Sequence, residues 1–488
     1  MCCGRRAMLR ISNLVAAALV ALMASYAQAY EQSIDRTMTF RGGRVTIDHR
    51  FGSVEVHTTG GNQVTVHAVV HASDPDFGRQ IEVITEASDG GVSIRTSYPE
   101  GHIHMRNGNF SYSVDLDVTI PERAPLSLKN RFGSVEVTGL RTASEIVNGQ
   151  GSITFRDGSG AQRIENSFGS ITIDNSRGNL SVQNANGSVH AQQVEGNLTV
   201  ANRFASVSVL NVSRDVTIRN SNGSVELRSV GGSANVTNSF ASVNVTDVRG
   251  SLDLTNQNGR VEVRDIKGGA IIHNSFASTS FSNIGRDLTV TSQNGRIEGT
   301  KVGGAVSVTG SYDTIDIRDI GGHATISSTN GNVMAVDING NLSVDTRFGL
   351  VKAERIHGSL DVENANGGVT ASDIAGSARV RTSFASVYLK GVNGSVSVEN
   401  QNGSIVVSGL RGSCDNVMLK TSFAPIKVAL PASASYNVEA RTSYGSISTD
   451  VPINVTKKSE NTLTGTIGSG SCKMELATSN GGISITRE

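Results

Sequence analysis

Histidine and carboxylate side chains are the residues of this chain that could bind metal ions or transfer protons. Six of the ten histidines lie near the N-terminus, and neutral imidazoles are good ligands for zinc and copper. No cysteine or carboxylate stands beside them at a metal-ligand spacing, so we expect polar surface histidines and no metal site. The six are His49, His57, His67, His71, His102 and His104.

Acidic residues recur at one position of the sequence repeat described below. Glu226, Glu262 and Glu298 are 36 residues apart, and Asp316 follows Glu298 by 18. General acid–base catalysis needs groups that converge on one substrate, whereas evenly spaced outward carboxylates form a solvated row. The chain also lacks a Gly-x-Ser-x-Gly elbow, a His-Glu-x-x-His motif and a phosphate-binding loop. We therefore expect no enzyme, no catalytic residue and no cofactor.

Aromatic residues have the most regular spacing in the chain. Eight follow one another at intervals of 36 residues, and Asn-Gly pairs recur at the same interval, offset by 18. The aromatic residues are Phe132, Phe168, Phe204, Phe240, Phe276, Tyr312, Phe348 and Phe384. The Asn-Gly pairs begin at Asn186, Asn222, Asn258, Asn294, Asn330, Asn366 and Asn402.

Two interpretations of this aromatic column stay open at the level of sequence. The rings form either a buried corner spine, each filling the space over a small residue, or an exposed stripe. Exposed rings roughly 10 Å apart could stack on a sugar polymer whose hydroxyl groups bind the intervening asparagines. Replacing Phe240 with alanine would separate the two, because a core ring supports stability whereas a site ring supports binding.

The two series define a unit of 18 residues that begins with the aromatic or amide residue, which we number position 0. Sixteen units run from Phe132 to about Leu419. Positions 3, 5, 8, 12 and 14 are mostly aliphatic, and position 10 is usually glycine. Position 16 is often asparagine, as in Asn148, Asn166, Asn184, Asn202, Asn220, Asn238, Asn256 and Asn274.

These columns predict an all-β fold, a single-stranded parallel β-solenoid with one unit per coil. Positions 3 and 5 alternate inward on one strand, positions 12 and 14 do so on a second, and position 8 points inward from a short third side. Glycine at position 10 marks a bend where a side chain would clash or φ is positive. Asparagine at position 16 is expected to form a structural, hydrogen-bonded ladder. We favour a right-handed coil of 18 residues, with a coil of 36 as the alternative.

Composition supports one extended structure and not several ordinary cores. Only 5% of residues are aromatic, Trp is absent and Gly accounts for 54 of 488 residues. Lys+Arg and Asp+Glu both number 43, and this balance excludes a basic nucleic-acid scaffold and an acidic tail. All seven prolines lie outside the repeats, as expected where every strand pairs on both sides.

The ends of the chain differ from the repeat tract. Residues 1–29 combine Arg5, Arg6 and Arg10 with an apolar run and an Ala-Gln-Ala cleavage site, which predicts a removable export signal and a mature chain without a membrane segment. We therefore expect four parts: the signal, an N-terminal β cap at 30–131, the solenoid at 132–419, and C-terminal coils with a cap at 420–488. Caps are needed because open solenoid ends polymerise.

Two cysteines remain after the export signal, Cys414 and Cys472. An exported pair suggests a disulfide, yet the repeat register places them about three coils, or roughly 14 Å, apart. Because a disulfide needs Cα atoms within about 7 Å, a bridge requires the C-terminal cap to fold back. Otherwise they are two buried small residues.

The repeat resembles a known family. Its columns, and the segment from Asp117 to Pro121 that leads into Phe132-Gly133-Ser134-Val135, are similar to the bacterial β-strand-repeat proteins grouped as candidate adhesins, a domain-of-unknown-function family. The resemblance implies an exported β-solenoid of the periplasm or cell surface and supplies no catalytic residues.

We expect a non-enzymatic, adhesin-like binding or spacer protein of the cell envelope. Its partner is an envelope or surface ligand, a glycan or a protein, and not a nucleic acid. The alternatives are a polysaccharide-binding or polysaccharide-active β-helix and a self-assembling envelope filament.

Overall fold

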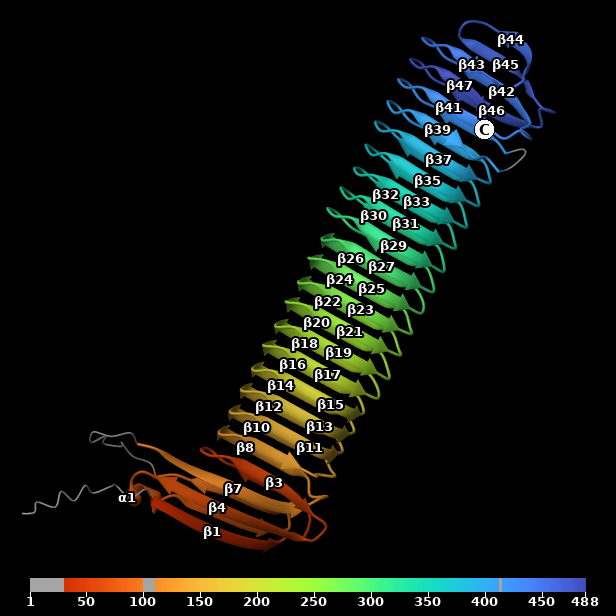
Figure 1. The fold of residues 1–488 in the computed structure, drawn as a ribbon. Coiled ribbons are helices and arrows are strands. Elements are labelled where there is room, and N and C mark those ends of the chain that lie inside the picture. Colours follow the sequence, from red (N-terminus) through yellow and green to blue (C-terminus); the bar gives the residue numbers. More distant parts are fainter. Residues whose placement is uncertain (1–29, 100–109, 412–414) are drawn as a thin grey trace, which may run out of the picture.

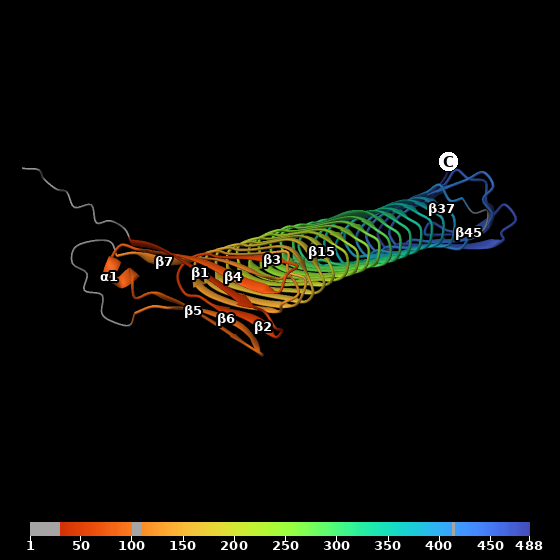
Figure 2. The ribbon, with the colours of Figure 1, turned by 90° about the horizontal axis from the view of Figure 1, so that it is seen from below.

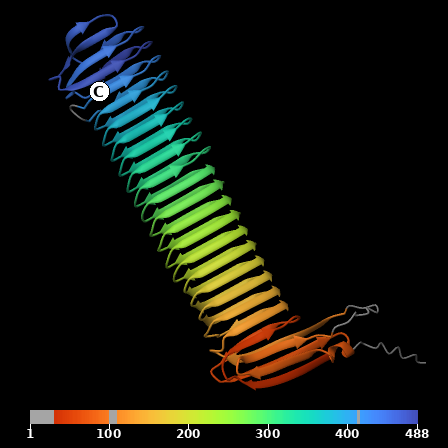
Figure 3. The same cartoon turned by 180° about the vertical axis from the view of Figure 1, so that it is seen from behind.

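The computed structural model describes residues 30–99, 110–411 and 415–488. The export signal predicted at 1–29, His102, His104 and Cys414 lie outside these ranges. The described chain is an all-β rod with a single short helix among its described residues, α1 (Pro75–Gly78). Figures 1 and 3 show a long straight stack of coils with a broader sheet at the N-terminal end. Among the described residues no helix is long and apolar enough to cross a membrane.

Each coil of the rod contains two strands that lie in two facing sheets. One sheet contains the odd-numbered strands, from β9 (Val135–Thr138) to β39 (Ile405–Ser408), and these begin at position 3. The other contains the even-numbered strands, from β10 (Ser144–Gln150) to β38 (Val396–Glu399), and these begin at position 12. Seen from below, the coils follow one another along the rod as stacked loops of similar outline (Figure 2).

The pairing register confirms a coil of 18 residues. Strand β17 (Val207–Val212) pairs in parallel with β19 (Val225–Val230), so that Val207 faces Val225. Because partners are 18 residues apart, the alternative coil of 36 residues is wrong. The coil's handedness stays a prediction.

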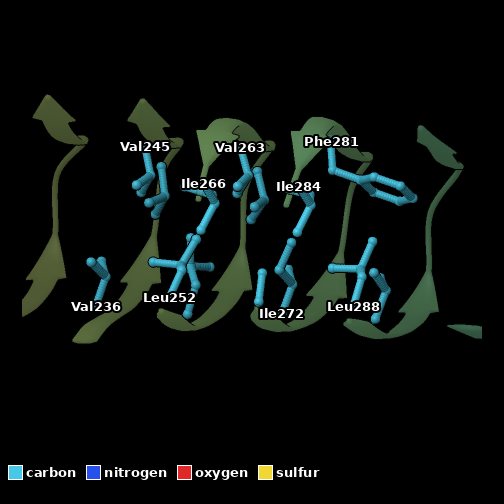
Figure 4. Close-up of a cluster of buried hydrophobic side chains, with 14 of the residues drawn as sticks. Val236, Val245, Leu252, Val263, Ile266, Ile272, Phe281, Ile284 and Leu288 are labelled. Carbon is cyan, nitrogen blue, oxygen red and sulfur yellow. The ribbon is translucent and has the colours of Figure 1, made fainter. Parts of the chain in front are cut away.

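Side chains from positions 3, 5, 12 and 14 fill the space between the two sheets, as predicted. Val245, Val263, Ile272 and Leu288, for example, are at most 1% exposed and point into one continuous core (Figure 4). Burying such apolar columns is the main favourable free energy of the fold.

The prediction of a third side at position 8 is wrong. Residues from position 3 to position 8 form one strand, but the residue at position 7 has a positive φ in all sixteen units, between 52° and 81°. That left-handed kink shifts the alternation by one residue, so positions 5 and 8 both point inward. Nine of the thirteen non-glycine residues at position 7 are Asn or Asp, which tolerate this conformation best.

Glycine is required at position 10 mainly because a side chain there would clash with the preceding coil, and less often because φ is positive. A Cβ added to Gly196 would lie 2.1 Å from the carbonyl oxygen of Gly178 in the preceding coil. Among the described position-10 glycines, only Gly160 and Gly178 have a positive φ.

The N-terminal cap adds antiparallel strands to the first coils. Strand β4 (Gln63–Ala72) pairs with β1 (Tyr30–Thr39) on one side and with β7 (Tyr112–Pro121) on the other. Strand β3 (Val54–Thr59) then joins β7 to β9 in parallel. The second sheet begins with the hairpin of β5 (Glu82–Ser88) and β6 (Gly91–Ser97), followed by β2 (Arg44–Asp48) and β8 (Leu126–Phe132).

The C-terminal end folds back into the stack. The last two strands insert out of sequence order: β46 (Cys472–Ala477) pairs between β40 (Val417–Lys420) and β42 (Tyr436–Arg441). In the other sheet β47 (Ile483–Arg487) pairs between β41 (Ile426–Leu430) and β43 (Ile447–Thr449). The hairpin of β44 (Asn454–Lys458) and β45 (Thr462–Ile467) covers the end of β42.

The fold-back meets the condition set for a disulfide. Cys472 is disulfide-bonded, and the neighbouring backbone amide of Lys473 donates to Asn416 Oδ1 at 3.1 Å. Cys414, the partner predicted from the sequence, lies outside the described residues.

Candidate functional site

The aromatic column lies on one edge of the rod and is exposed. Seven of its eight predicted members expose 47–66% of their surface, which makes a buried spine wrong for these seven. They are Phe168, Phe204, Phe240, Phe276, Tyr312, Phe348 and Phe384. Phe132, the first member, is half-buried. Soluble proteins seldom expose so many aligned rings.

The strands of the second sheet place the rings. Strand β16 (Leu198–Phe204) ends on a ring, and that ring faces Asn186 in the coil before and Asn222 in the coil after. From Tyr312 onward these strands end two or three residues earlier, so the ring lies in the turn that follows. Along the whole column, ring and amide residues therefore occupy alternate coils, with rings about 9.6 Å apart.

The buried asparagines of position 16 hold this edge in place, but they do not form the predicted ladder of stacked amides. The Nδ2 atom of Asn166 donates to the carbonyl oxygens of Gly151, at 2.9 Å, and Gly169, at 3.1 Å. Each of these oxygens belongs to the position-1 residue of a neighbouring turn. Asn148, Asn166, Asn184, Asn202, Asn220, Asn238, Asn256 and Asn274 all donate to such carbonyls, and among the described residues no partner accompanies their Oδ1 atoms.

Threonine performs the same bonding where asparagine is absent. Thr382 Oγ1 donates to the carbonyl of Gly367 at 2.9 Å, and Thr478 Oγ1 donates to that of Ala424 at 3.1 Å. Where position 16 is asparagine or one of these threonines, its side chain therefore fixes the turn that leads into the next ring or amide. The structural role agrees with the prediction, but the amides bond main-chain carbonyls and not one another.

The column continues into the C-terminal fold-back, which sequence spacing did not predict. Phe423 and Tyr444 expose 62% and 81% of their surface. Asn480 lies between them in space, because its backbone amide donates to Ser422 while that of Tyr444 donates to Ser479. The order along the edge is therefore ring, amide, ring, although Asn480 comes last in the sequence. The sequence signal for this continuation of the column is the Asn480-Gly481 pair, which resembles the start of a repeat unit.

At the N-terminal end the column begins in an aromatic cluster. Phe51 stacks on Phe132 with ring centroids 5.2 Å apart and ring planes within 3°. Tyr98 and Tyr112 meet Phe51 edge-on. Burial raises the pKa of Tyr98 above its usual value of 10, and the guanidinium of Arg131 lies 5.3 Å from the Phe132 centroid.

The outward faces of the sheets hold ion pairs. Glu226 bonds Arg228 at 2.6 Å and Glu298 bonds Arg296 at 3.0 Å. Asp316 binds Arg318 through two hydrogen bonds, which raise the pKa of that guanidinium. The acidic row predicted from the sequence is thus a row of paired carboxylates, of which Glu226 and Glu298 are solvated whereas the side chain of Asp316 is only 15% exposed.

Three of the N-terminal histidines, His57, His67 and His71, are paired with carboxylates. His49 is instead buried, so the prediction of a surface histidine is wrong there. His67 Nδ1 lies 2.7 Å from Asp35, and His71 lies between Glu31 and Asp115. Within the described ranges no group of three His, Cys, Asp or Glu side chains is arranged to hold a metal ion.

Comparison with known proteins finds a family model that matches the C-terminal part of the chain. Residues 282–486 match the Toastrack DUF4097 family. The Toastrack segment begins in β25 (Thr279–Ile284) and includes the fold-back, with the rings of Tyr312, Phe348 and Phe384. It confirms the predicted resemblance to a domain-of-unknown-function family.

Two solved structures are similar to the chain at low identity. A candidate cell adhesion protein from Clostridium sporogenes is 8% identical, covers 94% of this chain over 100% of its own, and gives a TM-score of 0.16. A candidate adhesin from Parabacteroides distasonis is 10% identical, with coverage of 70% and 97% and a TM-score of 0.18. Superpositions this weak carry no argument about this chain. No curated protein matches it.

Proposed function

We propose that the protein is an exported, non-enzymatic, adhesin-like rod that binds its partner through the aromatic column. The observation that supports this most strongly is the exposure of the rings, half of whose surface is in water at one edge along most of the rod. Covering a half-exposed ring removes roughly 100 Å² of apolar surface from water, worth about 2 kcal/mol before the entropy of association is subtracted.

The rest of the surface supports a binding role over catalysis. The outward carboxylates of Glu226, Glu298 and Asp316 are each paired with an arginine, whereas general acid–base catalysis needs groups that converge on one substrate.

A triple alanine variant tests the proposal. Phe204, Phe240 and Phe276 are replaced together, and binding of the purified protein to bacterial envelope fragments, to immobilised polysaccharides and to immobilised copies of itself is measured. We expect binding to the wild-type target to fall at least tenfold, because each ring contributes to one continuous contact.

The matched control replaces Thr199, Thr289 and Thr325, which are exposed on the flat face of the second sheet, with alanine. This variant should bind as the wild type does. If the ring variant is folded and still binds every wild-type target with unchanged affinity, the column is not the contact surface and the proposal is wrong.

A further inference from the structure

The alternation of rings and amides along the column is not required by sterics. Phe51 and Phe132 occupy neighbouring coils, and their rings stack face to face at 5.2 Å. A ring on every coil would therefore fit, and the rod would gain apolar contact from it. The size of the rings therefore does not account for the asparagines between them.

Sequence duplication does not explain the alternation either. A duplicated unit of 36 residues would account for rings at every second coil within the tract. At the C-terminal end, however, the coil that contains Asn480 is inserted between the coils of Phe423 and Tyr444, out of chain order. The alternation is kept there although no tandem copying could produce it.

The space left between successive rings has the size of one aromatic ring. Rings two coils apart are separated by about 9.6 Å, so a ring inserted midway would stand about 4.8 Å from each neighbour. The Phe51–Phe132 stack shows that this chain accepts rings at such a separation. An amide side chain lies at the base of each gap. Asn186 and Asn222 donate to main-chain carbonyls at 3.3 and 3.4 Å, which keeps these amides close to the rod.

Resting on the function proposed above, we propose that the partner of the aromatic column is the same column of a second copy of this chain. The rings of each rod enter the gaps of the other. A two-fold axis parallel to the rods would set each ring against its own copy at the same height. An axis perpendicular to the rods, midway between a ring coil and an amide coil, sets every ring against a gap and makes a closed, antiparallel dimer.

The exposed apolar area of the rings is sufficient for such a dimer. Nine residues of the column are at least 47% exposed: Phe168, Phe204, Phe240, Phe276, Tyr312, Phe348, Phe384, Phe423 and Tyr444. Full engagement would bury roughly 1,800 Å² over two copies, and five rings per copy would still bury about 1,000 Å². Specific interfaces start near that lower value.

The chemistry of the rings favours a protein partner over a glycan. Seven of these nine residues are phenylalanine, which has no polar group to bond sugar hydroxyls, whereas aromatic residues are enriched in the cores of protein interfaces. The position before the ring is serine at Ser167, Ser239, Ser275, Ser311 and Ser383, which is small enough for a close approach of two edges.

Filling a gap with a ring tests the proposal, because the added ring should weaken binding of a second copy and should not weaken binding of a different partner. Asn366 is exposed on the column, and Asn366→Phe with Asn402→Phe adds apolar surface while closing two gaps. We expect the dimer dissociation constant, measured by sedimentation of the purified protein, to rise at least tenfold. Phe348→Ala with Phe384→Ala should weaken the dimer to a similar degree.

Thr289→Phe with Thr325→Phe is the matched control, since it adds the same apolar surface to the flat face of the second sheet and should leave dimerisation unchanged. The proposal is overturned if the wild type stays monomeric at high concentration, or if the gap-filling variant dimerises more tightly. A monomer that still binds polysaccharide or envelope fragments through its rings would refute the second copy as partner while leaving the proposed function standing. Self-association that ignores all four ring and gap substitutions refutes the second copy as partner, and the proposed function fails as well if binding to polysaccharide and envelope fragments also ignores them.

Discussion

At the scale of single residues, the fold depends on backbone positions that only certain side chains tolerate. Position 7 adopts a left-handed conformation in every unit, and position 1 brings the main chain of one coil against the next. Residue types at position 7 vary between Asn, Asp, Gly and others, so the sequence column that would reveal the kink is weak. Position 3, by contrast, is nearly always β-branched, and the strand it begins was predictable.

Position 1 gives a sharp test of crowding between coils. Gly223 has φ of 151°, and an added Cβ would lie 2.1 Å from the carbonyl oxygen of Ala205. Gly223→Ala should therefore lower the free energy of unfolding by about 2–4 kcal/mol. Gly60→Ala is the control, because nothing lies within 4 Å of the added atom there. Equal urea midpoints for the two variants would contradict this account.

His49 predicts a pH dependence for the N-terminal cap. Burial lowers its pKa from 6.5 to about 4, and its Nδ1 lies 3.0 Å from Thr96 Oγ1. Because the folded pKa is below the unfolded value, the stabilising contribution of the neutral ring is complete above pH 6.5 and is lost as pH falls towards 4.

The loss should reach about 3 kcal/mol at pH 4, and His49→Gln should remove it. The measurement is urea unfolding of both proteins at pH 7.5 and pH 4.5. An identical change between the two pH values in both proteins would show that His49 does not titrate as described.

At the scale of strands, the core tolerates exceptions when neighbouring coils compensate. Gly299 occupies position 5, where every other unit has an aliphatic or aromatic residue, and its missing side chain is replaced by the ring of Phe281 from the coil before. Phe155 fills the space beside Gly158, three residues later on the same strand, β11 (Ile153–Ser159). The aliphatic columns predicted which strands form, but these exchanges depend on packing within and between coils that one sequence does not display.

A double substitution tests this exchange. Phe281→Val alone should destabilise the protein by about 2–4 kcal/mol, because it leaves a cavity that Gly299 cannot fill. Gly299→Val alone should destabilise it through a clash with the ring. The pair together should recover at least half of the summed loss in urea unfolding. Simple addition of the two losses would mean that the residues do not exchange volume.

At the scale of the whole molecule, rings and amides alternate along one edge of the rod. This alternation continues in the fold-back, where the coils no longer follow the order of the sequence. The repeat tract and its coil length followed from fixed spacing, since an inserted residue would break every column. The fold-back did not, because β46 and β47 return to the stack after an irregular segment whose length sets no register. The exposure of the rings also escaped prediction, because the same spacing suits a buried corner and an outward edge.

The most direct measurement compares stability and binding in one variant, Phe240→Ala. The exposed ring should contribute less than about 1 kcal/mol to the free energy of unfolding, against about 3–5 kcal/mol for a core ring such as Phe281. The account predicts a protein that unfolds at nearly the wild-type urea concentration and binds its wild-type target more weakly. A loss of stability above about 3 kcal/mol, with binding by the folded fraction unchanged, would place the column in the core and contradict the account.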